Sequence, residues 1–213
     1  MIVPLQIKRD FIPTTLPTRP GTKLSASYIT VHNTDNEAKG AGAAAHNAYV
    51  RGPDAVTRMV SWHYTVDDKL AYQHLPDDEV GYHASTKAGN TQSIGIEICM
   101  NSDMDVTKGY ANAAVLVAHC VAGQKLKFPN CMKQHKDWNS KYCPRVLLDG
   151  AKLTWRDFIK LCEEQVEAVG ESVAVPAALP MRAEGDGNDW NPENAAEILR
   201  SIDDSMSHHH DSE

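Results

Sequence analysis

Alternating apolar and polar positions predict several strands in this chain. In residues 27–34, isoleucine and valine lie on one face of an extended segment, and His32 lies near its end on the other face. Residues 93–100 place three isoleucines on one face and Glu97 on the opposite one. Two further stretches, separated by an acidic turn, predict a β-hairpin over residues 61–68 and 70–76. The alternation therefore directs His32 and Glu97 away from the apolar faces of their strands.

Longer segments without this alternation predict helices. The alanine-rich residues 40–51 indicate a helix that is closed by the Gly-Pro pair after it. Residues 108–128 are apolar almost all round, which is typical of a helix buried against a sheet. Residues 149–170 have apolar positions at helical spacing, with Gly170 as the expected C-cap. Strands interspersed with these helices predict an α/β domain with a mixed central β-sheet flanked by helices.

A change of composition near residue 170 predicts where the compact domain ends. Residues 1–170 contain all the segments described above, so we expect one domain there. Residues 171–188 are rich in proline, alanine and glycine and indicate a linker. Residues 189–213 predict a short helix, over about residues 192–203, and a flexible tail. Such a segment is too short to hold a core of its own.

Net charge and hydropathy limit the classes of partner that the chain could bind. The 213 residues carry a formal net charge of −7, with a pI near 5.8, whereas a protein that binds a phosphate backbone normally shows a basic patch. No apolar stretch approaches the roughly 18 to 20 residues of a membrane span, and the first residues lack the order of a secretory signal. We therefore expect no nucleic-acid partner, no membrane insertion and synthesis in the cytoplasm without a signal peptide. The oligomeric state stays open.

Three residues are candidate ligands of a metal ion. The five cysteines form an odd set without the spacing of a disulfide framework, so reduced thiols are expected and one is free to bind a metal. His135 and Cys143 lie in one loop, and His32 lies at a strand end. Two imidazoles and a thiolate suit zinc, which at catalytic sites leaves its fourth position to water. Because the loop lacks a C-x-x-C motif, ordinary structural roles for these side chains remain the alternative.

Two charged residues could act beside such a metal. Lys141 lies two positions before Cys143, so in an extended loop both side chains point the same way. Its ammonium group could then stabilise a developing oxyanion. Glu97 could take a proton from an attacking water and pass it to a leaving amine. The alternatives are an ordinary solvated strand residue for Glu97 and a surface charge for Lys141.

Five short strings follow one another along the chain: "YITVHNT", "SWHYTVDD", "GYHAS", "SIGIEIC" and "QHKDWNSKYCP". In their order and separation they resemble the N-acetylmuramoyl-L-alanine amidases shared by phage endolysins, wall amidases of prophage or sporulation, and animal peptidoglycan recognition proteins. The resemblance covers about residues 20 to 165 and is closest to the Gram-positive branch. It implies an amidase-like mixed sheet and a zinc cofactor bound by His32, His135 and Cys143. It also implies that Glu97 is the general base and then acid, and that Lys141 stabilises the oxyanion.

The resemblance also bears on the substrate groove. His83 matches a histidine that lines the groove rather than binding metal. Part of the family carries a catalytic tyrosine where this chain has Trp62, so that role falls to Glu97, and Tyr64 is a doubtful catalytic residue that we expect among the substrate contacts with Trp62. Trp138 is expected either in packing or at the groove rim. His46 is most simply a structural residue.

The resemblance implies hydrolysis of the amide between N-acetylmuramic acid and the L-alanine of the peptidoglycan stem peptide. The protein would then lyse or remodel the bacterial cell wall, reaching it after phage-type release or cell lysis. A binding module of the same fold that does not cut its ligand is the main alternative, although such modules typically lack the cysteine ligand. A glycosidase, which needs two carboxylates flanking a sugar bond, and a purely structural zinc protein are further alternatives.

Overall fold

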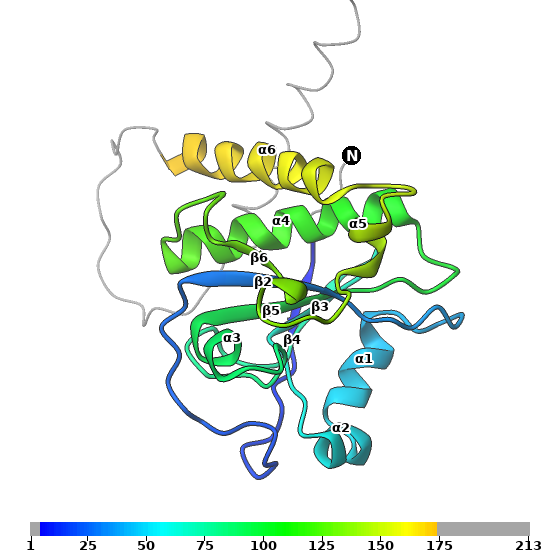
Figure 1. Ribbon diagram of the computed structural model, residues 1–213, viewed down its shortest axis with the longest axis vertical. Coiled ribbons are helices and arrows are strands. Elements are labelled where there is room, and N and C mark those ends of the chain that lie inside the picture. The colour runs from blue at the N-terminus through cyan, green and yellow to red at the C-terminus, as the bar shows by residue number, and fades with distance from the viewer. Residues whose placement is uncertain (1–4, 174–213) are drawn as a thin grey trace, which may run out of the picture. The chain divides into compact units, whose positions relative to one another are not determined.

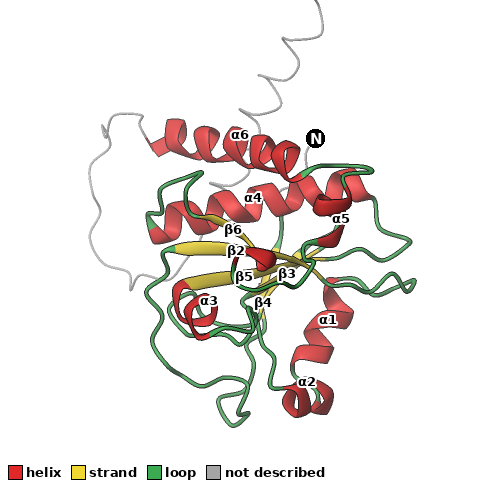
Figure 2. Cartoon of the chain, viewed as in Figure 1, coloured by secondary structure: helices red, strands yellow, loops and turns green. Residues whose placement is uncertain are grey.

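The computed structural model describes residues 5–173, and a six-stranded mixed β-sheet runs through their centre (Figures 1 and 2). The strands are Ile7–Arg9 (β1), Tyr28–Asn33 (β2), Tyr64–Val66 (β3), Ala71–Gln73 (β4), Ser93–Ile98 (β5) and Met132–Gln134 (β6). They lie in the order β1-β4-β3-β5-β2-β6, in which the β3–β4 pair alone is antiparallel. The predicted mixed sheet and its hairpin are confirmed, whereas the sequence analysis did not identify β1 and β6.

The central strands β2 and β5 separate an apolar face of the sheet from a functional face. They pair in parallel and in register, so His32 of β2 lies directly beside Glu97 of β5. The alternate residues of both strands belong to the main hydrophobic core. Because successive side chains point to opposite faces of a sheet, His32 and Glu97 lie together on the face away from this core. The strand pattern predicted this arrangement.

Helices cover both faces of the sheet. They span Ala43–Val50 (α1), Pro53–Arg58 (α2), Lys87–Gln92 (α3), Val106–Gln124 (α4), Arg145–Asp149 (α5) and Trp155–Val173 (α6). Helix α4 packs on the apolar face, where its buried side chains join those of β2 and β5 in the main core. Helices α1, α2 and α3 lie on the other side (Figure 1). The functional face is therefore bordered by short helices and loops.

The helix boundaries differ from those predicted. The helix expected over residues 40–51 ends at Val50, and a second helix, α2, follows at once. Pro53 begins α2 rather than only ending α1, because proline suits the first turn of a helix, where its missing N–H needs no partner. Helix α4 ends at Gln124, short of the expected 128, because Lys125 adopts the left-handed conformation with φ 53°.

The helix expected over residues 149–170 begins later than predicted, as α6 at Trp155, and a separate short helix, α5, precedes it. Helix α5 ends at Asp149, and its C-cap Gly150 has a left-handed φ of 66°. Helix α6 begins after Thr154, whose hydroxyl accepts a hydrogen bond from the Asp157 N–H while the Asp157 carboxylate accepts one from the Thr154 N–H. The prediction of Gly170 as a C-cap is wrong, because α6 continues to Val173.

Contacts divide the chain into two units. Residues 5–166 form one, which contains the whole sheet and the site described below. The other comprises residues 1–4 and 167–213, of which the structure describes the helical residues 167–173. The predicted linker beyond Val173 and the predicted helix over 192–203 lie outside the described residues. Within residues 5–173, no helix is both long and apolar enough to cross a membrane.

Candidate metal and active site

His32, His135 and Cys143 come together at one end of the sheet. Their potential ligand atoms all lie within 4.8 Å of one another, and all three residues are buried. The topology explains this meeting, because β6 pairs in parallel with β2 and His135 follows directly after β6. A 3-10 helix, His135–Asp137 (η1), then turns the chain. The sheet therefore places His135, the histidine of the loop, beside His32 of the strand.

The loop brings Cys143 back to His135. The Lys136 N–H donates a hydrogen bond to the Cys143 carbonyl over 3.0 Å, which closes the loop at its base. A second backbone bond, 2.9 Å from the Cys143 N–H to the Lys141 carbonyl, tightens the turn before the cysteine. Through this closure, His135 and Cys143, eight positions apart, present their side chains to the same point. The sequence spacing alone did not reveal the closure.

One ring nitrogen of each histidine, Nδ1, is placed to receive a metal ion. His32 Nδ1 lies 3.8 Å from Cys143 Sγ. His135 Nε2 lies 3.2 Å from the Asn139 amide nitrogen, whereas His135 Nδ1 is buried without a hydrogen-bond partner. A buried polar atom without a partner costs free energy unless something binds it. The donor set of two imidazoles and one sulfur therefore fits a metal ion on structural grounds.

Burial holds both histidines in the neutral form that binds metals. Desolvation lowers the pKa of His32 well below its ordinary value, and lowers that of His135 to about 4. Desolvation also raises the pKa of the Cys143 thiol to about 12, so without a cation this sulfur keeps its proton. A bound metal ion would supply the positive charge that stabilises a thiolate.

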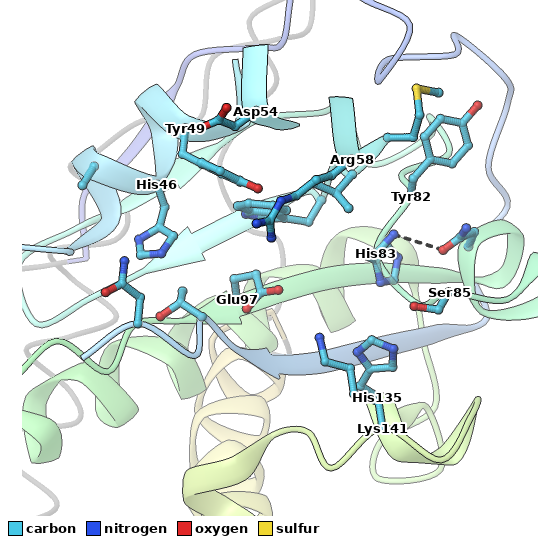
Figure 3. Close-up of a pocket in the computed structure, with 17 residues that line it drawn as sticks. His46, Tyr49, Asp54, Arg58, Tyr82, His83, Ser85, Glu97, His135 and Lys141 are labelled. Carbon is cyan, nitrogen blue, oxygen red and sulfur yellow. Dashed lines mark hydrogen bonds between the residues drawn. The ribbon is translucent and has the colours of Figure 1, made fainter. Parts of the chain in front are cut away.

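Glu97 lies beside this cluster as a partly buried carboxyl group. Its Oε2 atom is buried and has no hydrogen-bond partner. Burial raises the pKa of Glu97 to about 8, although the nearby Lys141 ammonium acts in the opposite direction. A pKa near neutral suits a group that must both accept and donate a proton. Figure 3 shows Glu97 in the same cavity as Lys141, with His135 beside Lys141.

The cavity has a volume of about 590 Å³ and opens over the functional face of the sheet. Its lining includes five of the residues that the sequence analysis assigned to the site: Trp62, His83, Glu97, His135 and Lys141. His32 and Cys143 are not part of this lining; they are buried next to His135, which is. One cavity therefore contains the candidate acid–base group and the candidate cation, next to the metal ligands.

Of the expected substrate contacts Trp62, Tyr64 and Trp138, only Trp62 lines the cavity. Trp62 lines the cavity and is held by a 2.7 Å hydrogen bond from its indole N–H to Thr65 Oγ1. Tyr64 does not line the cavity: it is 1% exposed, belongs to the main core and donates its hydroxyl proton to Asp77 over 2.7 Å. Trp138 also lies outside the lining, where its indole N–H donates to Thr30 Oγ1. Of its two expected roles, packing is the one these contacts support.

His83 reaches the cavity, yet its ring faces mostly into the protein. The residue is buried, and desolvation lowers its pKa to about 3. One ring nitrogen lies 3.0 Å from His32 Nε2 and the other 3.1 Å from the Ser93 carbonyl oxygen. His83 lines the cavity, but both polar atoms of its ring already have partners in the protein.

Helices α1 and α2 add cavity residues that the sequence analysis missed. His46, which was interpreted as structural, lines the cavity, as do Tyr49, Asp54 and Arg58 (Figure 3). The His46 Nδ1–H donates to the Gly42 carbonyl over 3.1 Å, which leaves Nε2 as an acceptor. No short motif marks these residues. Spacing of three to four positions along two helices was the available signal, and it is also typical of ordinary packing.

Comparisons with known proteins agree with this geometry. The family described as N-acetylmuramoyl-L-alanine amidase matches residues 22–146. The chain is 48% identical over 156 residues to N-acetylmuramoyl-L-alanine amidase XlyA of Bacillus subtilis, covering 72% of this chain and 50% of that protein. It is 46% identical to N-acetylmuramoyl-L-alanine amidase CwlH of Bacillus subtilis, covering 72% of this chain and 59% of that protein. It thus spans between half and three-fifths of the length of these relatives.

A solved structure gives the same result for the fold. The catalytic domain of XlyA superposes with a TM-score of 0.68 at 46% sequence identity. The match covers 74% of this chain and 99% of that domain. The matched family segment contains the three candidate metal ligands, Glu97 and Lys141.

Proposed function

Since the chain belongs to the N-acetylmuramoyl-L-alanine amidase family, we propose that it hydrolyses the amide between N-acetylmuramic acid and L-alanine in peptidoglycan. The observation that carries the proposal is the cavity that joins Glu97 and Lys141 to the cluster of His32, His135 and Cys143. Its substrate would be the bacterial cell wall, which the protein would lyse or remodel. The names of the relatives support the same reaction.

We propose zinc as the metal ion held by His32, His135 and Cys143. Two neutral imidazoles and one thiolate are ligands that zinc prefers, and three protein ligands are typical of its catalytic sites. When bound there, zinc would polarise the scissile carbonyl and lower the pKa of water. The partnerless His135 Nδ1 and the 3.8 Å separation of Cys143 Sγ from His32 Nδ1 support this assignment.

Glu97 would move the protons of the reaction. Its carboxylate accepts a proton from the water molecule that attacks the carbonyl carbon, and then delivers this proton to the alanine nitrogen as the C–N bond breaks. The raised pKa of Glu97 keeps both steps accessible near neutral pH. The Lys141 ammonium, which lines the same cavity, would stabilise the negative charge that develops on the carbonyl oxygen. Because one of the three ligands would be a thiolate, the metal site would carry less positive charge than a site of three histidines, and the Lys141 ammonium would restore positive potential there.

A non-catalytic module that binds peptidoglycan is the second candidate. The complete ligand set and the unpaired, partly buried Glu97 argue against it, because binding alone requires neither. The deciding experiment incubates the full chain with purified peptidoglycan and measures the new chemical groups. Amidase activity predicts new amino groups on alanine without new reducing ends. New reducing ends would indicate a glycosidase, and no new group of either kind would indicate a binding module.

A further inference from the structure

The hydrogen bonds of His83 determine which of its nitrogens carries a proton. His83 Nε2 lies 3.1 Å from the Ser93 carbonyl oxygen, and a carbonyl can only accept. The hydrogen must therefore be on His83 Nε2. A neutral imidazole carries one N–H, so His83 Nδ1 is an acceptor. The group that lies 3.0 Å from it is His32 Nε2, which must then be the donor.

The tautomer of His32 determines which of its nitrogens faces the candidate metal ligands. If His32 Nε2 carries the proton, His32 Nδ1 carries the lone pair. That atom is the one 3.8 Å from Cys143 Sγ. We propose that His83 is a positioning residue, which accepts the His32 Nε2–H and so holds the Nδ1 lone pair of His32 toward the metal ion. Metal-binding histidines generally need such a partner on the other ring nitrogen to fix the tautomer and the ring orientation.

The acceptor end of this chain of hydrogen bonds is itself held rigidly. Ser93 begins β5, and its hydroxyl donates to the Gly89 carbonyl over 2.7 Å while accepting from Thr30 Oγ1 over 2.7 Å. The backbone N–H of His83 donates to Asn90 Oδ1, a bond drawn in Figure 3. Both the ring of His83 and the carbonyl that orients it are therefore fixed to β2, α3 and β5.

Gly95 provides the space for the His83 ring. A Cβ atom at position 95 would lie 2.6 Å from His83 Cγ and 2.8 Å from His83 Nδ1. No side chain could occupy that position without moving the ring. Glycine weakens a strand interior, so its presence in the middle of β5 calls for a close approach of this kind. Gly95 thus allows the His83 ring to lie where it can accept the His32 Nε2–H.

The protonation of the ring nitrogens can be read directly in the unmodified full chain. Long-range ¹H–¹⁵N spectra of the zinc-free protein distinguish the two tautomers of each histidine. We expect His32 and His83 each to carry a single proton, on Nε2. A proton on His32 Nδ1, or two protons on His83, would overturn the proposal.

Zinc affinity provides the second readout, in a full chain whose histidine tract is removed by His208→Ala, His209→Ala and His210→Ala. His83→Leu deletes the acceptor and should weaken zinc binding by about 10- to 100-fold in a chelator competition. His83→Asn places an amide oxygen near the former Nδ1 and should stay within about threefold of the parent. Equal affinities for the parent and His83→Leu, or equal losses for both variants, would contradict the proposal.

Two glycine-to-alanine variants test the position of the His83 ring without removing its imidazole. Gly95→Ala should displace the His83 ring and weaken zinc binding about tenfold or more. Gly123→Ala is the matched control, because a Cβ atom there would have nothing within 4 Å. An unchanged zinc affinity in Gly95→Ala would count against the proposal. If either variant fails to fold, the tautomers of the unmodified chain decide the question.

The inference rests on the metal site of the proposed function, but its tests do not measure hydrolysis. A chain with the expected tautomers and zinc affinities that leaves peptidoglycan intact would refute the amidase proposal and keep the role of His83. A chain that cleaves the amide but carries the His32 proton on Nδ1 would refute the role of His83 and keep the amidase proposal. The two failures are therefore distinguishable.

Discussion

At the scale of single residues, Lys141 is the clearest case in which position rather than residue type defines a role. Lys136 and Lys141 are both exposed lysines of the same loop, yet Lys141 alone of the two lines the cavity. Lys141→Met should lower kcat about 100-fold, because the charge on the developing oxyanion loses a cation. Lys136→Met is the matched control and should leave kcat unchanged. Equal rates for both variants in a muropeptide assay would exclude the role of Lys141.

Glu97 should also leave a signature in the pH dependence of stability. Its pKa in the folded chain is about 8, compared with an ordinary value of 4.5. Between these values the folded state binds more protons than the unfolded state, so the free energy of unfolding falls as pH rises. The buried histidines act in the opposite direction, but their contribution is half complete at about pH 6.5, the ordinary histidine pKa, and nearly complete about one pH unit above it.

The measurement compares metal-free wild-type protein with Glu97→Gln by urea unfolding between pH 6.5 and 8. The wild type should lose up to about 1.4 kcal/mol per pH unit relative to the variant. Parallel pH profiles for the two proteins would show that Glu97 ionises normally, and would remove the basis for its assignment as both base and acid.

At the scale of elements, the first turns of α6 are part of the main core. Phe158 is 0% exposed, and its ring lies edge-on to that of Tyr110 of α4, with the centroids 5.8 Å apart. Phe158→Ala should lower the free energy of unfolding by about 3 to 5 kcal/mol, because a large cavity remains. The control is Tyr142→Ala, at a residue that is 58% exposed, for which a loss within about 0.5 kcal/mol is expected. Similar losses for both would contradict the packing described.

The elements also show how far the sequence alone could lead. The alternation in β2 and β5 predicted that His32 and Glu97 share a face, and the pairing of the strands places them side by side. The short strands β1 and β6 were missed because three residues carry too little periodicity to be recognised. Without β6, nothing in the sequence pattern explained why His135 should lie next to His32; the family resemblance supplied that expectation.

The other site residues whose positions differ from the predictions also depend on tertiary structure. Tyr64 and Trp62 share the parity expected of one strand, but β3 begins only at Tyr64, so Trp62 is free to take a different direction. Tyr64 therefore lies in the core, whereas Trp62 reaches the cavity. His46 and Arg58 reach it because two consecutive helices border the functional face. Tertiary arrangement of this kind is not encoded in local patterns.

At the scale of the whole molecule, metal binding and folding should be coupled. The buried ligand set exists only in the folded chain, so zinc at about 100 times its Kd should raise the free energy of unfolding by about 2.7 kcal/mol. A chelator should reverse the effect, and Cys143→Ser should reduce it. Cys162→Ala also removes a buried cysteine but lies outside the cluster, so its zinc-dependent increment should equal that of the wild type. An equal increment in Cys143→Ser would exclude the sulfur as a ligand.

The most direct test of the account is the rate of amide cleavage by zinc-loaded wild-type protein and zinc-loaded Glu97→Gln, with the zinc content of both measured in the same preparations. The account predicts equal zinc content and a rate that is lower in the variant by at least about 100-fold, because proton transfer is lost while the metal ligands are kept. A variant that retains its zinc and releases L-alanine amino groups from peptidoglycan at the wild-type rate would contradict it.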